Sequence, residues 1–448
     1  GNLTLTATDS AAILADAVGA SIAVGASGAS YGGALSIGVS IAENIISNET
    51  RAYIDNSGLP DSEKTIELNA GNVSILATSM DIIDALSIAA SISVGAGTKA
   101  GIALSGGGSN STNVILTKTN AYILNTDLES TGDVLLAATN TSDIDAIVVT
   151  ASVSAGFGGK AGVAASVGAS LAQNLIGWDE DGVHTPAQVQ AYVKDSAVDT
   201  GGDLTLRAVA NAAIEAVVVA GSVAISGGGT AGVGLAGSGA DAENKISTLV
   251  KAFIEGDGDT GIIADNVTLT ALDTSNITAD VGAGSLAASF AGTAAISLSI
   301  GVALAENTIQ NDVEAYIAHA DTLTARDGSV TLLAVESATV DALSVAASLA
   351  ASFGNVGVAL SGAGSDTVNT IANIVKAYIS DSDVSTNPSF DYTQQDIPAE
   401  IVNGDRVGLD NGRIRRQLKR SFPKRRSRRR RRHLPPPHFF ARENGTGG

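Results

Sequence analysis

Carboxylates in glycine-containing turns are the residues of this sequence best suited to chemistry. Asp257 and Asp259 stand in the stretch EGDGDTG, and Asp179 and Asp181 stand in the stretch DEDG. Flexible turns that present carboxylate oxygens are what Ca²⁺ prefers as a site. Neither stretch matches an EF-hand loop or the nonapeptide of calcium-binding β-rolls. Solvated acidic turns are therefore the favoured interpretation, and Ca²⁺ is kept as a cofactor hypothesis for these four residues.

Other catalytic or binding groups lack partners at a useful spacing. His184 and His319 have no local partner with metal-ligand or triad spacing, and the chain has no Cys. The segment 156–162 resembles a phosphate loop only loosely, because no Ser or Thr follows Lys160. A polysaccharide-active β-helix enzyme stays as the alternative, but it needs clustered carboxylates and an aromatic platform, and Trp178 is the one Trp. We expect a protein that is not an enzyme.

Composition points to closely stacked backbone. The 448 residues include 51 Gly, 44% are hydrophobic, and only 4% are aromatic. Residues 1–412 hold 12 Lys and Arg against 45 Asp and Glu, whereas residues 413–448 hold 14 Lys and Arg against one Glu. Such an acidic body is a poor partner for nucleic acid. No uninterrupted apolar run is long enough for a membrane helix, so we predict no membrane span.

One aromatic element returns six times at spacings of 69, 70, 61, 63 and 62 residues. Its aromatic residues are Tyr53, Tyr122, Tyr192, Phe253, Tyr316 and Tyr378. An Asn precedes each aromatic residue by nine positions, except in the third unit, where an insertion lengthens the gap. These residues are Asn44, Asn113, Asn174, Asn244, Asn307 and Asn369. The favoured roles are structural: Asn satisfying turn amides at a corner, and the aromatic residue filling the core or stacking.

The fold class that follows is all-β, a repetitive β-solenoid of about six units of 61–70 residues. A short alternating strand pattern also recurs, as in Asn2–Ala7 and Asn72–Ala77, and a Gly-rich tract of small residues separates the two elements. Such units bury surface only by stacking on their neighbours. Three coils per unit at roughly 4.8 Å each would give an array of about 85 Å. Stacked β-hairpin repeats are the alternative.

The repeats resemble the modules of very large bacterial β-strand-repeat surface adhesins, similar in style to filamentous haemagglutinin-like exoproteins. The resemblance is carried by the strand after Gly132-Asp133, the Ala/Gly/Ser/Val tract, the repeated Asn and the closing Ala-Tyr-Ile, over residues 1 to about 383. It implies a structural or adhesive region of an exported protein, extracellular or at the cell surface, that acts as a stalk or an adhesion surface. Host or matrix glycans or proteins are the implied partners, besides neighbouring repeats of the chain.

Three segments are expected along the chain. Residues 1–383 form the repeat array, and 384–412 form a spacer or the start of another module. Residues 413–448 form a basic low-complexity tail, interpreted as disordered or as a frame error because Arg is rare before it. The chain starts within a strand pattern at Leu3 and carries no signal peptide, which we interpret as a piece of a longer protein.

Overall fold

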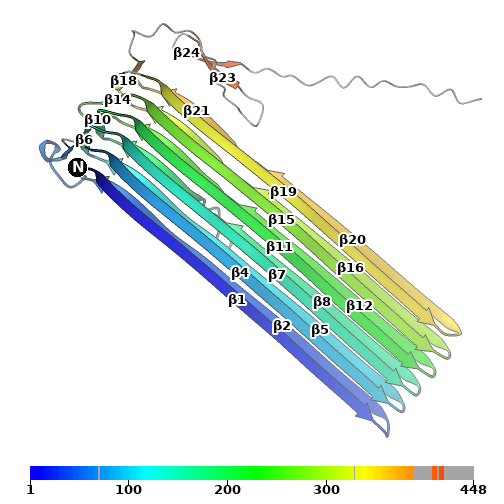
Figure 1. Cartoon of the computed structure of the whole chain (residues 1–448). Helices are drawn as coiled ribbons and strands as arrows, with labels where there is room; N and C mark the ends of the chain where they lie inside the picture. Colours follow the sequence, from blue (N-terminus) through cyan, green and yellow to red (C-terminus); the bar gives the residue numbers. More distant parts are fainter. Residues whose placement is uncertain (69–70, 327, 387–405, 411–412, 418–448) are drawn as a thin grey trace, which may run out of the picture. The chain divides into compact units, whose positions relative to one another are not determined.

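A computed structural model describes residues 1–68, 71–326, 328–386, 406–410 and 413–417. The chain divides into two compact units, Gly1–Gln395 and Asp396–Gly448. The first unit is a parallel β-solenoid of six coils (Figure 1), so the predicted repetitive all-β solenoid is confirmed. Among the described residues, no helix is long and apolar enough to cross a membrane.

Each coil contributes strands to three parallel sheets. Sheet A contains β1 (Leu3–Ser27), β4 (Val73–Gly97), β7 (Val134–Gly158), β11 (Leu204–Gly228), β15 (Val267–Ala291) and β19 (Val330–Phe353). Sheet B contains β2 (Tyr31–Asp55), β5 (Ala100–Leu124), β8 (Ala161–Ile176), β9 (Ala187–Lys194), β12 (Ala231–Ile246), β13 (Thr248–Glu255), β16 (Ala294–Ile309), β17 (Asp312–Ala318), β20 (Val356–Ile371) and β21 (Ile374–Ser380). The short sheet C contains β3 (Thr65–Leu68), β6 (Asp127–Ser130), β10 (Ala197–Thr200), β14 (Ile262–Ala264), β18 (Leu323–Ala325) and β22 (Val384–Thr386).

Each sequence unit forms one coil, so the estimate of three coils per unit is wrong. β1 pairs with β4 over its whole length, from Leu3 opposite Val73 to Ser27 opposite Gly97. Equivalent aromatic rings in adjacent coils are 4.8–5.0 Å apart. Six coils therefore extend roughly 24 Å along the stack instead of about 85 Å. The error arises because the Gly-rich tract forms two 25-residue strands in the first coils, β1 and β2, where several short strands were expected.

The two long strands of a coil lie face to face and do not pair with each other. β1 pairs with β4, and β2 pairs with β5, so every ladder joins neighbouring coils. The alternative of stacked β-hairpins therefore describes the outline of each coil (Figure 1) but not its hydrogen bonding.

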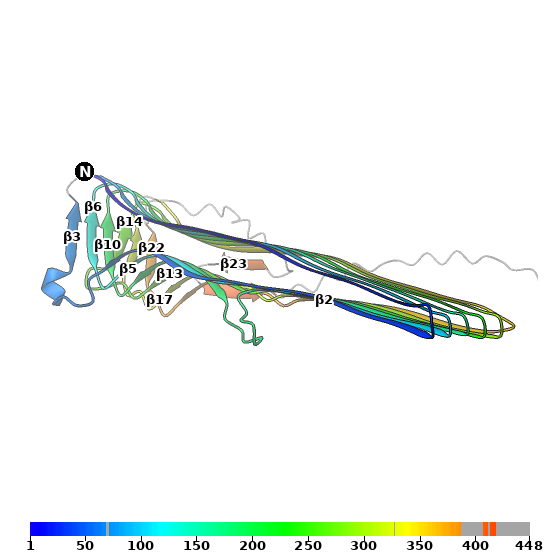
Figure 2. The same ribbon diagram turned by 90° about the horizontal axis from the view of Figure 1, so that it is seen from below.

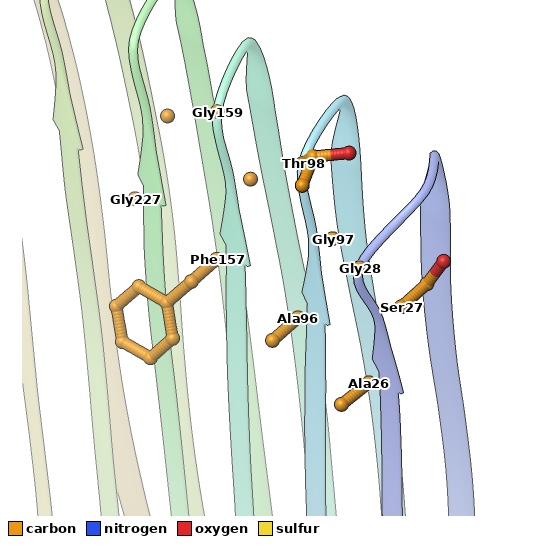
Figure 3. Close-up of a pocket in the computed structure, with 11 residues that line it drawn as sticks. Ala26, Ser27, Gly28, Ala96, Gly97, Thr98, Phe157, Gly159 and Gly227 are labelled. Carbon is orange, nitrogen blue, oxygen red and sulfur yellow. The ribbon is translucent and has the colours of Figure 1, made fainter.

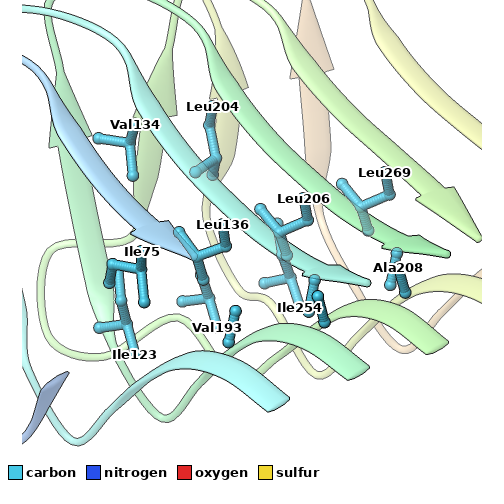
Figure 4. Packing of buried hydrophobic residues seen from close by; sticks show 14 of the residues in the cluster. Ile75, Ile123, Val134, Leu136, Val193, Leu204, Leu206, Ala208, Ile254 and Leu269 are labelled. Carbon is cyan, nitrogen blue, oxygen red and sulfur yellow. The ribbon is translucent and has the colours of Figure 1, made fainter. Parts of the chain in front are cut away.

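At one end of the coil, sheets A, B and C enclose an apolar core, and we call this part the base. Figure 4 shows Ile75, Leu136 and Leu206 from sheet A against Ile123 and Val193 from sheet B. All five side chains are fully buried. Alternation in each strand places these residues inside and polar residues such as Thr outside.

Towards the other end the two long sheets converge into a thin two-layer slab (Figure 2), which we call the blade. It comprises residues 18–40, 88–109, 149–170, 219–240, 282–303 and 345–365. Sheet contact is very close: a Cβ on Gly19 would lie 1.9 Å from the carbonyl oxygen of Val39, and one on Gly25 would lie 1.8 Å from that of Gly33. Only Gly fits these inward positions, because the opposing atom is backbone.

The corner between sheets B and C uses left-handed backbone in five coils. The residues there are Asn125, Asp195, Gly256, His319 and Asp381, with φ between 45° and 74°. Gly, Asn and Asp adopt this conformation most readily, which explains most of these residue types. His319 is the least suited of the five.

The C-terminal segments predicted from composition are described only in part. The sixth coil runs to Thr386 at the end of β22, so it includes the first residues of the predicted spacer. In the second unit, β23 (Arg406–Asp410) pairs antiparallel with β24 (Arg413–Gln417), the start of the predicted basic tail. The rest of the spacer and of the tail lies outside the described residues.

Candidate functional site

The repeated aromatic residues form one continuous stack. Each ring lies 4.8–5.0 Å from the next, with interplanar angles of 2–6°. Tyr122, Phe253 and Tyr316 are buried, whereas Tyr53 at the edge of the stack is half exposed. Burial raises the pKa of Tyr192 to about 12. The stack aligns successive coils in register.

The repeated Asn residues form a second ladder, inside the solenoid. The side-chain amide of each Asn donates to the side-chain oxygen of the next at 2.7–2.8 Å, from Asn44 through to Asn369. Asn113, Asn174, Asn244 and Asn307 are completely buried. These residues lie within long strands of sheet B and bond to one another, not to turn amides at a corner as we expected. The reason is that parallel in-register stacking places equivalent amides one strand spacing apart.

A layer of buried carboxylates lies between the base core and the Asn ladder. Asp273 accepts hydrogen bonds from Thr248 at 2.6 Å and from Ser275 and Asn311 at 2.8 Å each. Its burial raises the pKa of its carboxyl to about 6 despite these three donors. In the adjacent coil, burial also raises the pKa of Glu336.

A second group of carboxylates lies at the same level in the first coils. Asn48 donates to Asp9 at 2.7 Å and to Asp81 at 3.2 Å, and burial raises the pKa of Asp81. The open end here is a cavity of about 410 Å³ lined in part by Asp9, Asn48 and Arg51. Ala187, Ala210 and Ala212 occupy the layer in the coils between the two groups, so the carboxylates form no continuous channel.

The four candidate calcium ligands lie in two separate turns. Asp179 accepts hydrogen bonds from the backbone amides of Asp181 and Val183, and Asp257 accepts one from the amide of Thr322. Asp259 lies in the same turn as Asp257, between β13 and β14. Within the described part of the chain, no group of three or more His, Cys, Asp or Glu is placed to hold a metal. The two turns satisfy backbone amides, which is the ordinary role of Asp in a turn.

The other sequence candidates occupy structural positions. The insertion in the third unit folds back, and His184 contacts Ser247 at 2.6 Å while its ring lies 4.5 Å from that of Trp178. His319 occupies the left-handed corner described above. Lys160 and its neighbouring Gly residues form the tip of the third coil, where β7 turns into β8.

The blade has an unusual distribution of polarity. On its outer faces, Val, Ile, Leu and Phe side chains alternate with small residues, and many are exposed, such as Val167, Ile296 and Phe290. Its inner faces are lined by Ser, Ala and Gly. Ser91 and Ser105 lie 2.6 Å apart across the two sheets, and Ser285 and Ser299 lie 2.7 Å apart.

Charge marks the limits of the blade. Among its residues only Lys99 and Lys160 are charged, and both are exposed at the tips. Carboxylates stand directly below it, including Asp84, Asp145 and Glu215 on the outer face of sheet A. Burial, together with the charges of neighbouring carboxylates, raises the pKa of Asp145.

A shallow hollow of about 650 Å³ lies at the blade tips. Figure 3 shows Phe157 as its one large side chain, beside Gly227, Ala96 and Ala26 of the neighbouring coils. It holds no titratable group and therefore suits an apolar ligand better than a reaction. Neither the hollow nor the apolar faces were identified from the sequence.

Comparisons with protein-family models, with curated proteins and with solved structures find no match to this chain.

Proposed function

We propose that this chain is a structural and adhesive repeat region of a large exported surface protein, and that it acts as an adhesion surface more than as a stalk. The carrying observation is that each unit of 61–70 residues adds one in-register coil. The alignment persists from Asn44 and Tyr53 to Asn369 and Tyr378, so coils can be added without changing the cross-section.

Dimensions favour a surface over a spacer. A unit advances the stack by 4.8–5.0 Å, whereas about 62 residues of extended chain would reach roughly 200 Å. A stalk built this way gains little length per residue. The same residues instead supply two long sheet faces per coil, and each further coil widens them. Adhesive area therefore grows with the number of units.

The test is attachment under flow. Microspheres coated with the full chain would be passed over glycans, extracellular-matrix proteins and supported lipid layers, with albumin-coated microspheres as the reference. We expect retention on at least one of these surfaces well above that reference. Retention equal to albumin on all of them would exclude the adhesive role and leave a purely structural one.

A further inference from the structure

We propose that the adhesion surface is the blade and that its partner is a lipid bilayer, whose acyl chains cover both outer faces. This proposal rests on the proposed function and names the partner of its surface. The first argument is the inverted polarity of the blade. Hydroxyls such as Ser91 and Ser105 are paired inside, whereas Ile92 and Ile102 point outward with 40% and 42% of their surface exposed. Apolar-outside and polar-inside is the arrangement expected of strands that contact lipid.

The second argument is depth. Gly19 lies against Val39 and Gly25 lies against Gly33, so residues at equal distance from the tip are level on the two faces. The outer apolar rows run over eight residue steps on each face, from 18 to 26 and from 39 to 31. At about 3.3 Å per residue they cover roughly 26 Å. The hydrocarbon core of a bilayer is about 30 Å thick.

The third argument is the position of charge. Acidic residues border the apolar rows on both faces at one level, for example Asp16 on β1 and Glu43 on β2. The exposed tips carry Lys99 and Lys160 and no acidic residue. Inserted tip first, the blade would place its two cations at the far headgroups and its carboxylates in water. Lysine side chains at such a depth favour anionic lipid headgroups.

The fourth argument separates lipid from a second copy of the chain. Both outer faces are apolar at the same depth, and a partner of fixed shape docked on one face would leave the other exposed. A fluid acyl-chain phase covers both faces at once. The backbone of the inner coils is ready for this environment, since β4, β7, β11 and β15 are paired on both sides. Only the edge strands, β1 and β19 in sheet A, have an unpaired side, so we expect inserted copies to meet along these edges.

The experiment uses the full chain with vesicles of phosphatidylcholine and phosphatidylglycerol, recovered by flotation. Because the chain has no Cys, single labels can be introduced at Ile92→Cys in the blade and at Met80→Cys in the base. Both residues are on the outer face of β4 and are 40% and 45% exposed. We expect an environment-sensitive dye at residue 92 to shift to shorter wavelength and to be quenched by acyl-chain quenchers. The dye at residue 80 should stay in water.

Charge variants at the same positions complete the test. Ile92→Glu should reduce vesicle recovery by about tenfold or more, and Met80→Glu by less than about twofold. Replacement of Lys99 and Lys160 by Gln should reduce recovery on anionic vesicles but not on vesicles of phosphatidylcholine alone. Circular dichroism would establish that each variant keeps its β-structure, and Ile92→Asn replaces Ile92→Glu if it does not.

Three outcomes would overturn the proposal. One is absence of the chain from floated vesicles, and another is equal loss of binding in the Ile92 and Met80 variants. The third is lipid-independent self-association that Ile92→Glu abolishes, which would make a second copy the partner. If vesicles fail while microspheres still attach to glycans or proteins, the proposed adhesive function survives and only the lipid partner is rejected.

Discussion

The base and the blade are made by the same strands but have opposite polarity. Along β4, Ile75 points into the base core, and Ser91, on the same face of the strand, points into the blade. The base is stabilised by burial of large apolar side chains, whereas the blade buries hydroxyls and backbone and leaves apolar groups outside. The comparison shows that a long strand keeps its alternation while the meaning of each face is reversed along it.

The largest expected effect is the loss of a base core side chain. Leu206→Ala removes a fully buried residue and should lower the free energy of unfolding by roughly 2–5 kcal/mol. The matched change Leu235→Ala, on the outer face of the blade in the same coil, should stay within about 0.5 kcal/mol. Denaturant titration of both variants measures the difference. Equal losses would mean that the blade is not inverted in solution.

The next effect is pH dependence in the carboxylate layer. The folded-state pKa of Asp273, raised to about 6, lies above its ordinary 3.8. Stability should therefore be highest below pH 3.8 and fall as the pH rises to 6, by about 3 kcal/mol. Asp273→Asn should remove this loss and be the more stable chain at pH 8.

Denaturant titration at pH 4 and pH 8 checks this prediction. Asp280→Asn, on the outer face of the same strand, is the control for loss of one negative charge. A stabilisation of Asp273→Asn that is the same at both pH values would contradict the proposed cause.

A smaller effect is expected from the close approach of the two blade sheets. A Cβ on Gly156 would lie 2.0 Å from the carbonyl oxygen of Val163, so Gly156→Ala should cost about 1–3 kcal/mol. Gly239→Ala, where a Cβ meets nothing within 4 Å, should be neutral or stabilise by about 0.5–1 kcal/mol. Hydrogen exchange of blade amides would show faster opening in the first variant alone, and similar exchange in both would argue against backbone contact between the sheets.

The smallest effect concerns the left-handed corners of the base. His319→Gly relieves the side-chain strain of a φ of 54° and should raise stability by at most about 1 kcal/mol. His319→Ala removes the imidazole but keeps the strain, so it should not be stabilising. Thermal unfolding midpoints of the two variants give the comparison. Stabilisation by Ala as well as Gly would assign the effect to the imidazole instead of the backbone.

The sequence predicts the solenoid because its repeats are regular, and equal spacing brings Asn113 beside Asn174 whatever the shape of the coil. It does not predict the coil length, because small residues such as Ala and Gly fit a turn as well as a strand. The inverted blade had a signal that we did not use. If alternation from Ile75 is followed without a break, Ser91 falls on the inner face and Ile92 on the outer face. Windows for apolar helices miss this pattern because Ser and Gly dilute it.

The direction of the ladders has a mechanical consequence. Hydrogen bonds between coils run along the stack, and the 25-residue strands run across it. A pull along the stack would open a junction from one end, loading a few bonds at a time. A pull along the blade would load all the bonds of a junction together, in shear. The molecule should therefore resist force many times better in the direction in which the blade points than along the line of its repeats.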